Sequence, residues 1–213
     1  MTQEAAGNRP SQGGSQMSDA PDFFTHSHAL CESDDVGPRT RVWAFAHILP
    51  GAAVGADCNV CDHAFIETGA VVGDRVTVKN RVMIFDGVTV EDDVFLGPAV
   101  VFTNDLRPRA EIKKSGDALT RTLVRRGATL GAGSVVVAGH TVGEYSFTGA
   151  GSVVATDLAP HGFYVGNPAR LRGWVCRCGE RLEADLRCRC GRSYRRVDPA
   201  SDPAGLEEVQ DGR

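Results

Sequence analysis

Apolar residues recur at every sixth position from residue 30 to residue 102, all of them aliphatic except Phe102, and no polar residue interrupts the series. The same six-residue spacing resumes in a shifted phase at residue 124 and continues to residue 154. Thr148 is the one polar residue in this second series. An α-helix repeats about every 3.6 residues and an amphipathic strand every second residue, so neither element explains this period. Small or β-branched residues, such as Ala46, Cys58 and Val76, follow four residues after most of the aliphatic positions.

A six-residue period is typical of a parallel β-helix, in which short strands coil so that one aliphatic side chain per strand points inward. Three such units complete one triangular coil, so residues eighteen apart should stack at a spacing of about 4.8 Å. Glycine often follows the aliphatic position directly, as at Gly55 and Gly73, where we expect tight corners that need a permissive backbone. The pattern therefore predicts an all-β protein built around one parallel β-helix.

The rhythm stops at Asn104, where the polar and basic stretch NDLRPRAEIKKSGDALTR is inserted. We expect residues 105–122 to form one loop that projects from the β-helix. Thr68, Asp86 and Asn104 are spaced eighteen residues apart, so they should stack on one corner at the foot of this loop. A long loop on a rigid scaffold is where a functional site is expected. A clasp that only locks subunits together is the alternative.

Composition divides the chain into four parts. Residues 1–25 and 198–213 are poor in large apolar side chains, and we expect both to be disordered tails. Residues 26–172 carry the predicted β-helix. Residues 173–197 hold four of the seven cysteines, and we expect them to form a small C-terminal appendage that resembles a zinc ribbon.

Several segments resemble one known family. The segments RVWAFAHILPGAAVG, VFLGPAVVFTNDLRPR, TLVRRGATLGAG, TVGEYSFTGAGSVV and YVGNPARLRGWVCRCGERL are similar to those of the left-handed parallel β-helix (hexapeptide-repeat) acyltransferases that acetylate an amino group on a nucleotide-linked sugar. The resemblance covers residues 26–182, and FTN with the basic loop after it is the most specific part. It implies a homotrimer, acetyl-CoA as donor, and active sites in the clefts between subunits. It also implies a role in making precursors of surface glycans such as lipopolysaccharide.

Amine acetylation requires particular side chains at the site. The amine must be neutral to attack the thioester carbonyl, and a base or the departing thiolate must take its proton. Asn104 matches the asparagine of the family's FTN motif, which implies that it holds or orients the amine. Asp105 and Asp86 are candidate proton acceptors, although aspartates also satisfy backbone groups in turns.

Candidate binding residues lie around the predicted loop and along the coils. For the nucleotide-linked sugar they are Glu67, Lys79, Asn80, Phe85, Arg107, Arg109 and His63. His63 is also a candidate base, because imidazole titrates near neutral pH, but a lone histidine is more often structural. The resemblance implies that coenzyme A runs along the later coils, where the candidates are Arg125, Arg126, Gly131, Gly149, Ala150, Asn167 and Arg170.

The cysteines near the C-terminus form two Cys-x-Cys-Gly units. Cys176, Cys178, Cys188 and Cys190 could supply the four thiolates of a closed structural zinc site, although Cys-x₂-Cys is the commoner spacing. Such a site has no open position for catalysis. Two disulfides are the alternative, which a reducing compartment disfavours.

The net charge of −4 argues against bulk attraction to nucleic acid or to an acidic membrane. No signal peptide or long apolar run is apparent, so we expect a cytoplasmic protein without membrane insertion. A metal-dependent enzyme of the γ-carbonic-anhydrase type would need a His-x₄-His pair, which the sequence lacks. The remaining alternatives are transfer of the acetyl group to oxygen, and a non-enzymatic β-helix scaffold whose basic zinc ribbon binds nucleic acid.

Overall fold

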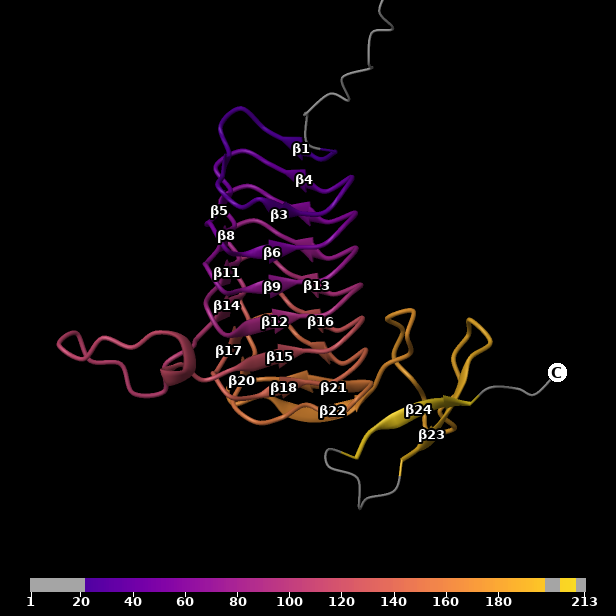
Figure 1. Cartoon of the computed structure of the whole chain (residues 1–213). Helices are drawn as coiled ribbons and strands as arrows, with labels where there is room; N and C mark the ends of the chain where they lie inside the picture. The colour runs from indigo at the N-terminus through magenta and orange to yellow at the C-terminus, as the bar shows by residue number, and fades with distance from the viewer. Residues whose placement is uncertain (1–21, 198–203, 210–213) are drawn as a thin grey trace, which may run out of the picture.

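The computed structural model describes residues 22–197 and 204–209, and most of these residues form a left-handed parallel β-helix (Figure 1). Its three sides are sheets A, B and C, and the chain passes from A to B to C in each coil. Sheet A contains β1 (Phe24–Thr25), β4 (Arg41–Val42), β7 (Asn59–Val60), β10 (Thr77–Val78), β13 (Phe95–Leu96), β16 (Thr129–Leu130), β19 (Phe147–Thr148), β21 (Gly162–Val165) and β22 (Arg170–Trp174). Sheet B contains β2 (Leu30–Cys31), β5 (His47–Ile48), β8 (Phe65–Ile66), β11 (Met83–Ile84), β14 (Val101–Phe102), β17 (Val135–Val136) and β20 (Val153–Val154). Sheet C contains β3 (Asp35–Val36), β6 (Ala53–Val54), β9 (Val71–Val72), β12 (Val88–Val90), β15 (Thr122–Val124) and β18 (Thr141–Val142).

The predicted spacing of eighteen residues is confirmed by the strand register. Met83 pairs with Phe65 on one side and with Val101 on the other, each eighteen residues away. The predicted aliphatic positions from Val42 to Phe102 are all buried, with at most 2% of their surface exposed. The positions in the shifted phase, including the hydroxyl-bearing Thr148, are buried as well. One aliphatic side chain per strand thus fills the interior of the coil.

The first coil departs from this register. Leu30 pairs with His47 and is 52% exposed, whereas Cys31 pairs with Ile48 and packs against the core. The spacing there is seventeen residues, so the assignment of Leu30 to the interior is wrong. The six-residue rhythm begins inside the protein only with Val36, which is partly buried against the core.

The three corners of the coil are called AB, BC and CA after the sheets that they join. The prediction of a permissive backbone at Gly55 and Gly73, on corner CA, is wrong. The positive φ angles lie two residues later, at Asp57 and Arg75, both with a φ of 57°. Gly55 is needed for a different reason, because a Cβ atom there would lie 2.6 Å from the carbonyl carbon of Gly73 in the next coil. The glycine therefore allows neighbouring coils to approach closely.

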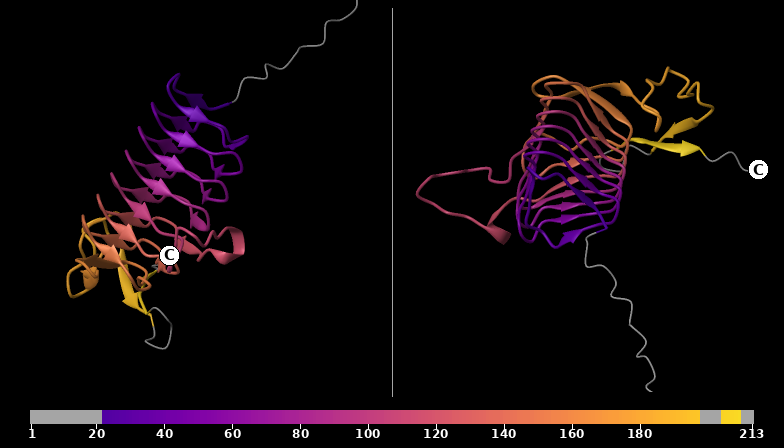
Figure 2. Two further views of the ribbon diagram at one scale, coloured as in Figure 1. Left: turned by 90° about the vertical axis from the view of Figure 1, so that its left-hand side faces the viewer. Right: turned by 90° about the horizontal axis from the view of Figure 1, so that it is seen from above.

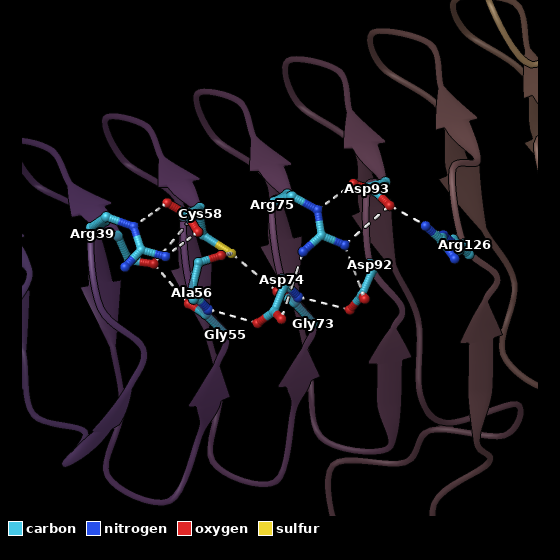
Figure 3. Close-up of polar contacts among 12 residues, drawn as sticks. Arg39, Gly55, Ala56, Cys58, Gly73, Asp74, Arg75, Asp92, Asp93 and Arg126 are labelled. Carbon is cyan, nitrogen blue, oxygen red and sulfur yellow. Dashed lines mark hydrogen bonds and ion pairs between the residues drawn. The ribbon is translucent and has the colours of Figure 1, made fainter.

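Charged side chains form a ladder along corner CA (Figure 3). Arg39 forms an ion pair with Asp57 in the next coil, at 2.6 Å from Nη2 to Oδ2. Farther along, Asp93 accepts hydrogen bonds from Arg75 (2.6 Å) and Arg126 (3.1 Å). These exposed pairs contribute little stability individually, but their spacing repeats that of the coils beneath them.

Two segments leave the β-helix, and they project from opposite sides of it (Figures 1 and 2). The predicted loop runs from residue 103 to residue 121 on corner BC and contains a short 3₁₀ helix, η1 (Gly116–Ala118). Thr122 already belongs to β15, so the loop ends one residue earlier than predicted. Partners across the loop, such as Val101 and Val135, lie 34 residues apart, which is sixteen more than one coil.

The second segment is the Cys-rich appendage, which follows β22. It contains β23 (Ser193–Arg196) and β24 (Leu206–Val209), which pair antiparallel. Cys176, Cys188, Tyr194 and Leu206 form its own small core. The prediction of a disordered tail is wrong for Leu206–Val209. It is also wrong for Phe24–Thr25, which form β1, whereas residues 1–21, 198–203 and 210–213 lie outside the described residues.

Within the described ranges, no helix has the length and the apolar character needed to cross a membrane.

Candidate functional site

Corner BC carries the polar column that the sequence predicts. The Asn104 side chain donates from Nδ2 to the backbone carbonyl of Asp86 one coil away, at 3.2 Å. The Thr68 hydroxyl likewise donates to the carbonyl of Pro50, at 2.6 Å. Because each residue is fixed to the coil beneath it, the column is part of the rigid scaffold.

Two carboxylates lie in this column. The Glu67 side chain accepts a hydrogen bond from the backbone N–H of Asp86, at 2.9 Å to Oε2. The Asp86 carboxylate lies against Gly69, where a Cβ atom would be only 2.3 Å from Asp86 Oδ1. Gly69 also has a φ of +84°, so this position favours glycine on two grounds. The absence of a side chain at Gly69 gives the Asp86 carboxylate its place on the corner.

The loop is fastened near its base. The Asp105 carboxylate pairs with the Lys114 ammonium at 2.5 Å and accepts a hydrogen bond from the backbone N–H of Arg107 at 2.8 Å. The hydrogen bond from Lys114, followed by that from Arg107, lowers the pKa of Asp105. A carboxylate held in this way is a weak base. The loop ends also meet, since the Thr120 N–H donates to the Asn104 carbonyl at 2.9 Å.

A cavity of about 380 Å³ lies between the polar column and the loop. It brings together four of the predicted site residues: Glu67, Asp86, Asn104 and Asp105. The other lining residues are Leu49, Thr68, Ile112, Lys113, Lys114, Ser115 and Leu119. The sequence prediction missed the two lysines, although the pair in EIKKSG was a visible signal of positive charge in the loop.

The remaining residues predicted for the sugar lie elsewhere. Arg107 and Arg109 are exposed in the loop and do not line the cavity. Phe85 is adjacent to Asp86 and lies near Phe65, with ring centroids 6.1 Å apart. Lys79 follows β10 on corner AB.

On corner AB a second cavity, of about 470 Å³, is lined by Asp62, His63, Asn80, Arg81, Pro98 and Ala99. The His63 ring packs edge-on against Phe45, with centroids 5.0 Å apart. In one chain, therefore, the residues predicted to bind the sugar lie on two corners, AB and BC, at the two edges of sheet B.

The residues predicted for coenzyme A are also distributed over different corners. Gly131, Gly149 and Ala150 lie on corner AB, and a Cβ atom on Gly131 would be 2.5 Å from the Thr148 carbonyl oxygen. Arg125 and Arg126 lie on corner CA, where each is 3.1 Å from a carboxylate oxygen, of Glu91 and Asp93 respectively.

Two further residues predicted for coenzyme A lie near the end of the β-helix. Asn167 precedes Pro168 through a cis peptide bond. Arg170 donates from Nη1 to the Ala169 carbonyl, at 3.3 Å. A single chain does not bring the seven predicted residues together.

The four cysteines of the appendage form one cluster, with all four Sγ atoms within 4.8 Å of one another. The Cys176–Cys190 and Cys178–Cys188 sulfur distances are both 3.5 Å. A disulfide needs about 2.05 Å, whereas tetrahedral zinc–sulfur bonds of about 2.3 Å place the sulfurs about 3.8 Å apart. The donors therefore fit a four-thiolate zinc site.

Both Cys-x-Cys-Gly units adopt the same turn. The N–H of Gly179 donates to the Cys176 carbonyl at 2.8 Å, and that of Gly191 to the Cys188 carbonyl at 2.9 Å. Both glycines have a φ of 92°, a region that favours glycine. The two turns thus present their cysteines in matching ways.

Coils of this kind, with a loop inserted at a polar corner, define a hexapeptide-repeat protein. No family model matches the sequence. The chain is 47% identical over 178 residues to dTDP-3-amino-3,6-dideoxy-alpha-D-galactopyranose 3-N-acetyltransferase from Aneurinibacillus thermoaerophilus, which covers 82% of this chain and 92% of that one. The chain therefore belongs to the family of hexapeptide-repeat N-acetyltransferases of nucleotide-linked amino sugars.

Solved structures are also similar. One is a mutant of GDP-perosamine N-acetyltransferase from Caulobacter crescentus in complex with CoA and GDP-perosamine, at 21% identity and a TM-score of 0.42. The match covers 71% of this chain and 58% of that one. Another is a mutant of AntD, an N-acyltransferase from Bacillus cereus, in complex with dTDP and coenzyme A. It is 16% identical, with a TM-score of 0.44 and coverage of 73% of this chain and 83% of that one.

Replacing Asp105 with Asn should loosen the loop, because the amide loses the ion pair with Lys114 at nearly constant volume. We expect trypsin to cleave after Arg109 several-fold faster in Asp105→Asn than in the unmodified protein. Asp117→Asn is the matched control, because Asp117 pairs with Arg121 at a fully exposed position in the same loop. Equal cleavage rates in the two variants would contradict the fastening role of Asp105.

The same ion pair predicts a pH dependence. Because the pKa of Asp105 is lowered, the stabilisation is complete above the ordinary aspartate value of about 3.9 and is lost as the pH falls through the lowered value. Hydrogen exchange of the loop amides, corrected for intrinsic rates, should therefore show the same protection at pH 5 and pH 7. A loss of protection between these values would contradict the assignment.

Proposed function

We propose that the protein transfers the acetyl group of acetyl-CoA to the amino group of a nucleotide-linked amino sugar. The relative from Aneurinibacillus thermoaerophilus supports a dTDP-linked 3-amino-3,6-dideoxyhexose as the acceptor. Acetyl-CoA as donor is supported by the family to which the chain belongs. Such a reaction supplies acetylated sugars for surface glycans and takes place in the cytoplasm, where acetyl-CoA is made.

The distribution of charge in the cavity on corner BC is the observation that carries this proposal. Asp86 and Glu67 lie on the β-helix side, and Lys113 and Lys114 come from the loop. Lys114 is paired with Asp105, whereas Lys113 forms no ion pair among the described residues. In a nucleotide-linked amino sugar, the sugar ring carries an amine and, at its anomeric carbon, the diphosphate that joins it to the nucleoside. It therefore matches carboxylates on one side and an ammonium group on the other. Arg107 and Arg109 of the same loop are proposed as further phosphate contacts.

In the proposed reaction, the sugar amine binds between Asn104 and Asp86. The Asn104 amide nitrogen is engaged by the Asp86 carbonyl, so its Oδ1 is the atom that accepts an N–H of the amine and directs the nitrogen lone pair toward the donor. The amine nitrogen attacks the thioester carbonyl carbon, and the carbon–sulfur bond then breaks to release the thiolate of coenzyme A. Asp86 receives the proton that the nitrogen loses, and Asp105 keeps its structural role in the loop.

Incubation with acetyl-CoA and a dTDP-linked 3-amino-3,6-dideoxyhexose tests the proposal. We expect release of the free thiol and a product heavier by one acetyl group. The corresponding 3-hydroxy sugar, which lacks the basic nitrogen, should react much more slowly. Equal rates would favour transfer to oxygen, and absence of thiol release with all amino sugars would contradict an acetyltransferase.

We also propose that the protein assembles as a homotrimer with the sites between subunits. The outward positions of sheet B are apolar along most of its length, and the residues are Phe65, Met83, Val101, Val135 and Val153. An apolar stripe on a sheet face favours association with another protein surface. Corners AB and BC flank this sheet, so association through it would bring residues of both corners close to a neighbouring chain. Sedimentation equilibrium showing a monomer under assay conditions would contradict this assembly.

Replacing Asn104 with Ala should disturb chemistry more than folding, because the rigid corner holds its position. We expect kcat/KM to fall by one to three orders of magnitude, or roughly 1.4–4 kcal/mol of transition-state stabilisation. Steady-state kinetics on the dTDP-linked amino sugar measures this, and the thermal midpoint serves as the control for folding. A correctly folded Asn104→Ala variant with full activity would place the catalytic centre elsewhere.

We propose that the four cysteines hold a structural zinc ion. With four thiolate ligands the ion has no open position, so it stabilises the appendage and takes no part in acetyl transfer. The reducing environment of a cytoplasmic protein favours this over two disulfides.

Removal of the zinc should therefore lower the stability of the protein more than it lowers the turnover of each molecule that remains folded. At free zinc a thousand times above Kd, binding would contribute about 4 kcal/mol to the appendage. We expect one zinc per chain by elemental analysis, less zinc in Cys188→Ser, and a lower melting temperature in that variant and after chelation. Loss of kcat at saturating concentrations of both substrates after chelation, with the fold and assembly intact, would contradict the structural role.

A further inference from the structure

A cavity of about 550 Å³ lies where the first cysteine turn meets corner CA of the β-helix. The residues that line it are Arg75, Asp93, Arg126, Gly127, Thr129, Tyr145, Arg177, Cys178 and Gly179. Its walls come from coils that are distant in sequence and from the Cys176–Gly179 turn. The cavity therefore depends on the placement of the appendage against the β-helix, and it lies on a different corner from the candidate acceptor site.

The lining contains three guanidinium groups. Asp93 is the only carboxylate in it, and it already bonds both Arg75 and Arg126 (Figure 3). Arg126 uses Nε for this contact, and its two terminal nitrogens form no hydrogen bond among the described residues. Among the described residues, no carboxylate lies within ion-pair distance of the Arg177 guanidinium. Arg75 is also bonded to Asp92, so the groups left for an anion are the Arg177 guanidinium and the terminal nitrogens of Arg126.

Neutralisation of the cysteine cluster does not explain Arg177. A zinc ion with four thiolates carries a net charge of −2, and a neighbouring cation would be expected to donate to a sulfur. The residue that does so is Arg192, whose Nη1 lies 3.3 Å from Cys190 Sγ. The Arg177 guanidinium instead lies over the Tyr145 ring, 5.2 Å from its centroid.

The Tyr145 ring is held in place on this corner. It stacks on His161, with centroids 5.3 Å apart and an angle of 27° between the rings. It also lies so close to Gly127 that a Cβ atom there would be 2.1 Å from the ring. Because both His161 and the Arg177 guanidinium lie against this ring, the ring positions Arg177. A guanidinium group held in this way can bind a phosphate bidentately.

We propose that this cavity binds the phosphates of a nucleotide, with Arg177 of the cysteine turn and Arg126 of the β-helix as the two cationic contacts. The inference rests on the proposed function, because both proposed substrates carry a nucleotide diphosphate. The two substrates share this phosphate chemistry, and titration with each ligand separately distinguishes between them. The cysteine turn acquires a role in ligand binding in addition to its role in stability.

Isothermal titration of the zinc-loaded full-length protein with coenzyme A and, separately, with dTDP tests the proposal. Arg177 and Arg189 occupy the same position in the two Cys-Arg-Cys-Gly units, but only Arg177 lines the cavity. Arg177→Ala should raise Kd at least tenfold for one of the two ligands, and Arg126→Ala should affect the same ligand. Arg189→Ala, which removes the same charge from an exposed position, should leave both Kd values unchanged.

The outcomes separate the possible sources. Weaker binding of coenzyme A alone would assign the cavity to the donor, and weaker binding of dTDP alone would assign it to the sugar nucleotide. Unchanged Kd values for both ligands in Arg177→Ala would overturn the proposal, as would an equal loss for both ligands. If the unmodified protein binds neither ligand, the proposed function itself fails, which is distinct from normal binding that Arg177→Ala leaves intact.

Discussion

Backbone hydrogen bonds between successive coils, whose paired residues lie eighteen apart, are the constraint on which the rest of this molecule depends. The N–H of Phe65 donates to the carbonyl of Val82, and that of Met83 to the carbonyl of Val100, so each coil is the template for the next. An unpaired backbone group inside such a stack is costly. An insertion must therefore leave at a corner and return in register. The loop does so, since Thr120 bonds the Asn104 carbonyl and Thr122 bonds that of Gly87.

The same constraint brings side chains from different coils together at the corners, where they can form a site. Because every coil contributes a residue to each corner, polar residues from successive coils form columns, and Thr68, Asp86 and Asn104 form one of them. The residues within a column are fixed by the strands on either side, which is the preorganisation that catalysis requires. The remaining groups of the two proposed sites come from elements that leave the scaffold, the loop on corner BC and the cysteine turn on corner CA.

The sequence predicted the scaffold well because one aliphatic residue per six can only repeat if the backbone repeats. It predicted the column on corner BC for the same reason, since eighteen residues is three repeats. Where the repeat is absent, the prediction had less to use. The first coil is one residue shorter than the others, so Cys31 takes the inward position predicted for Leu30. Leu206 forms part of β24 because its side chain is buried in the small core of the appendage, which lies outside the repeat.

Side-chain contacts outside the repeat were the least predictable. The pairing of Asp105 with Lys114 depends on how the loop folds back, which no period encodes. The carboxylates beside Arg125 and Arg126 come from an earlier coil, on the other side of the insertion. Residues proposed for one ligand lie on different corners of one chain, and the sequence shows corners only as positions within a repeat.

A crystal structure with a dTDP-linked 3-amino-3,6-dideoxyhexose bound tests the central claim most directly. The account predicts that the amine nitrogen lies on corner BC, within hydrogen-bond distance of Asn104 Oδ1 and the Asp86 carboxylate. An amine bound instead at His63 and Asn80 on corner AB, with Asn104 and Asp86 of every subunit remote from it, would contradict the account.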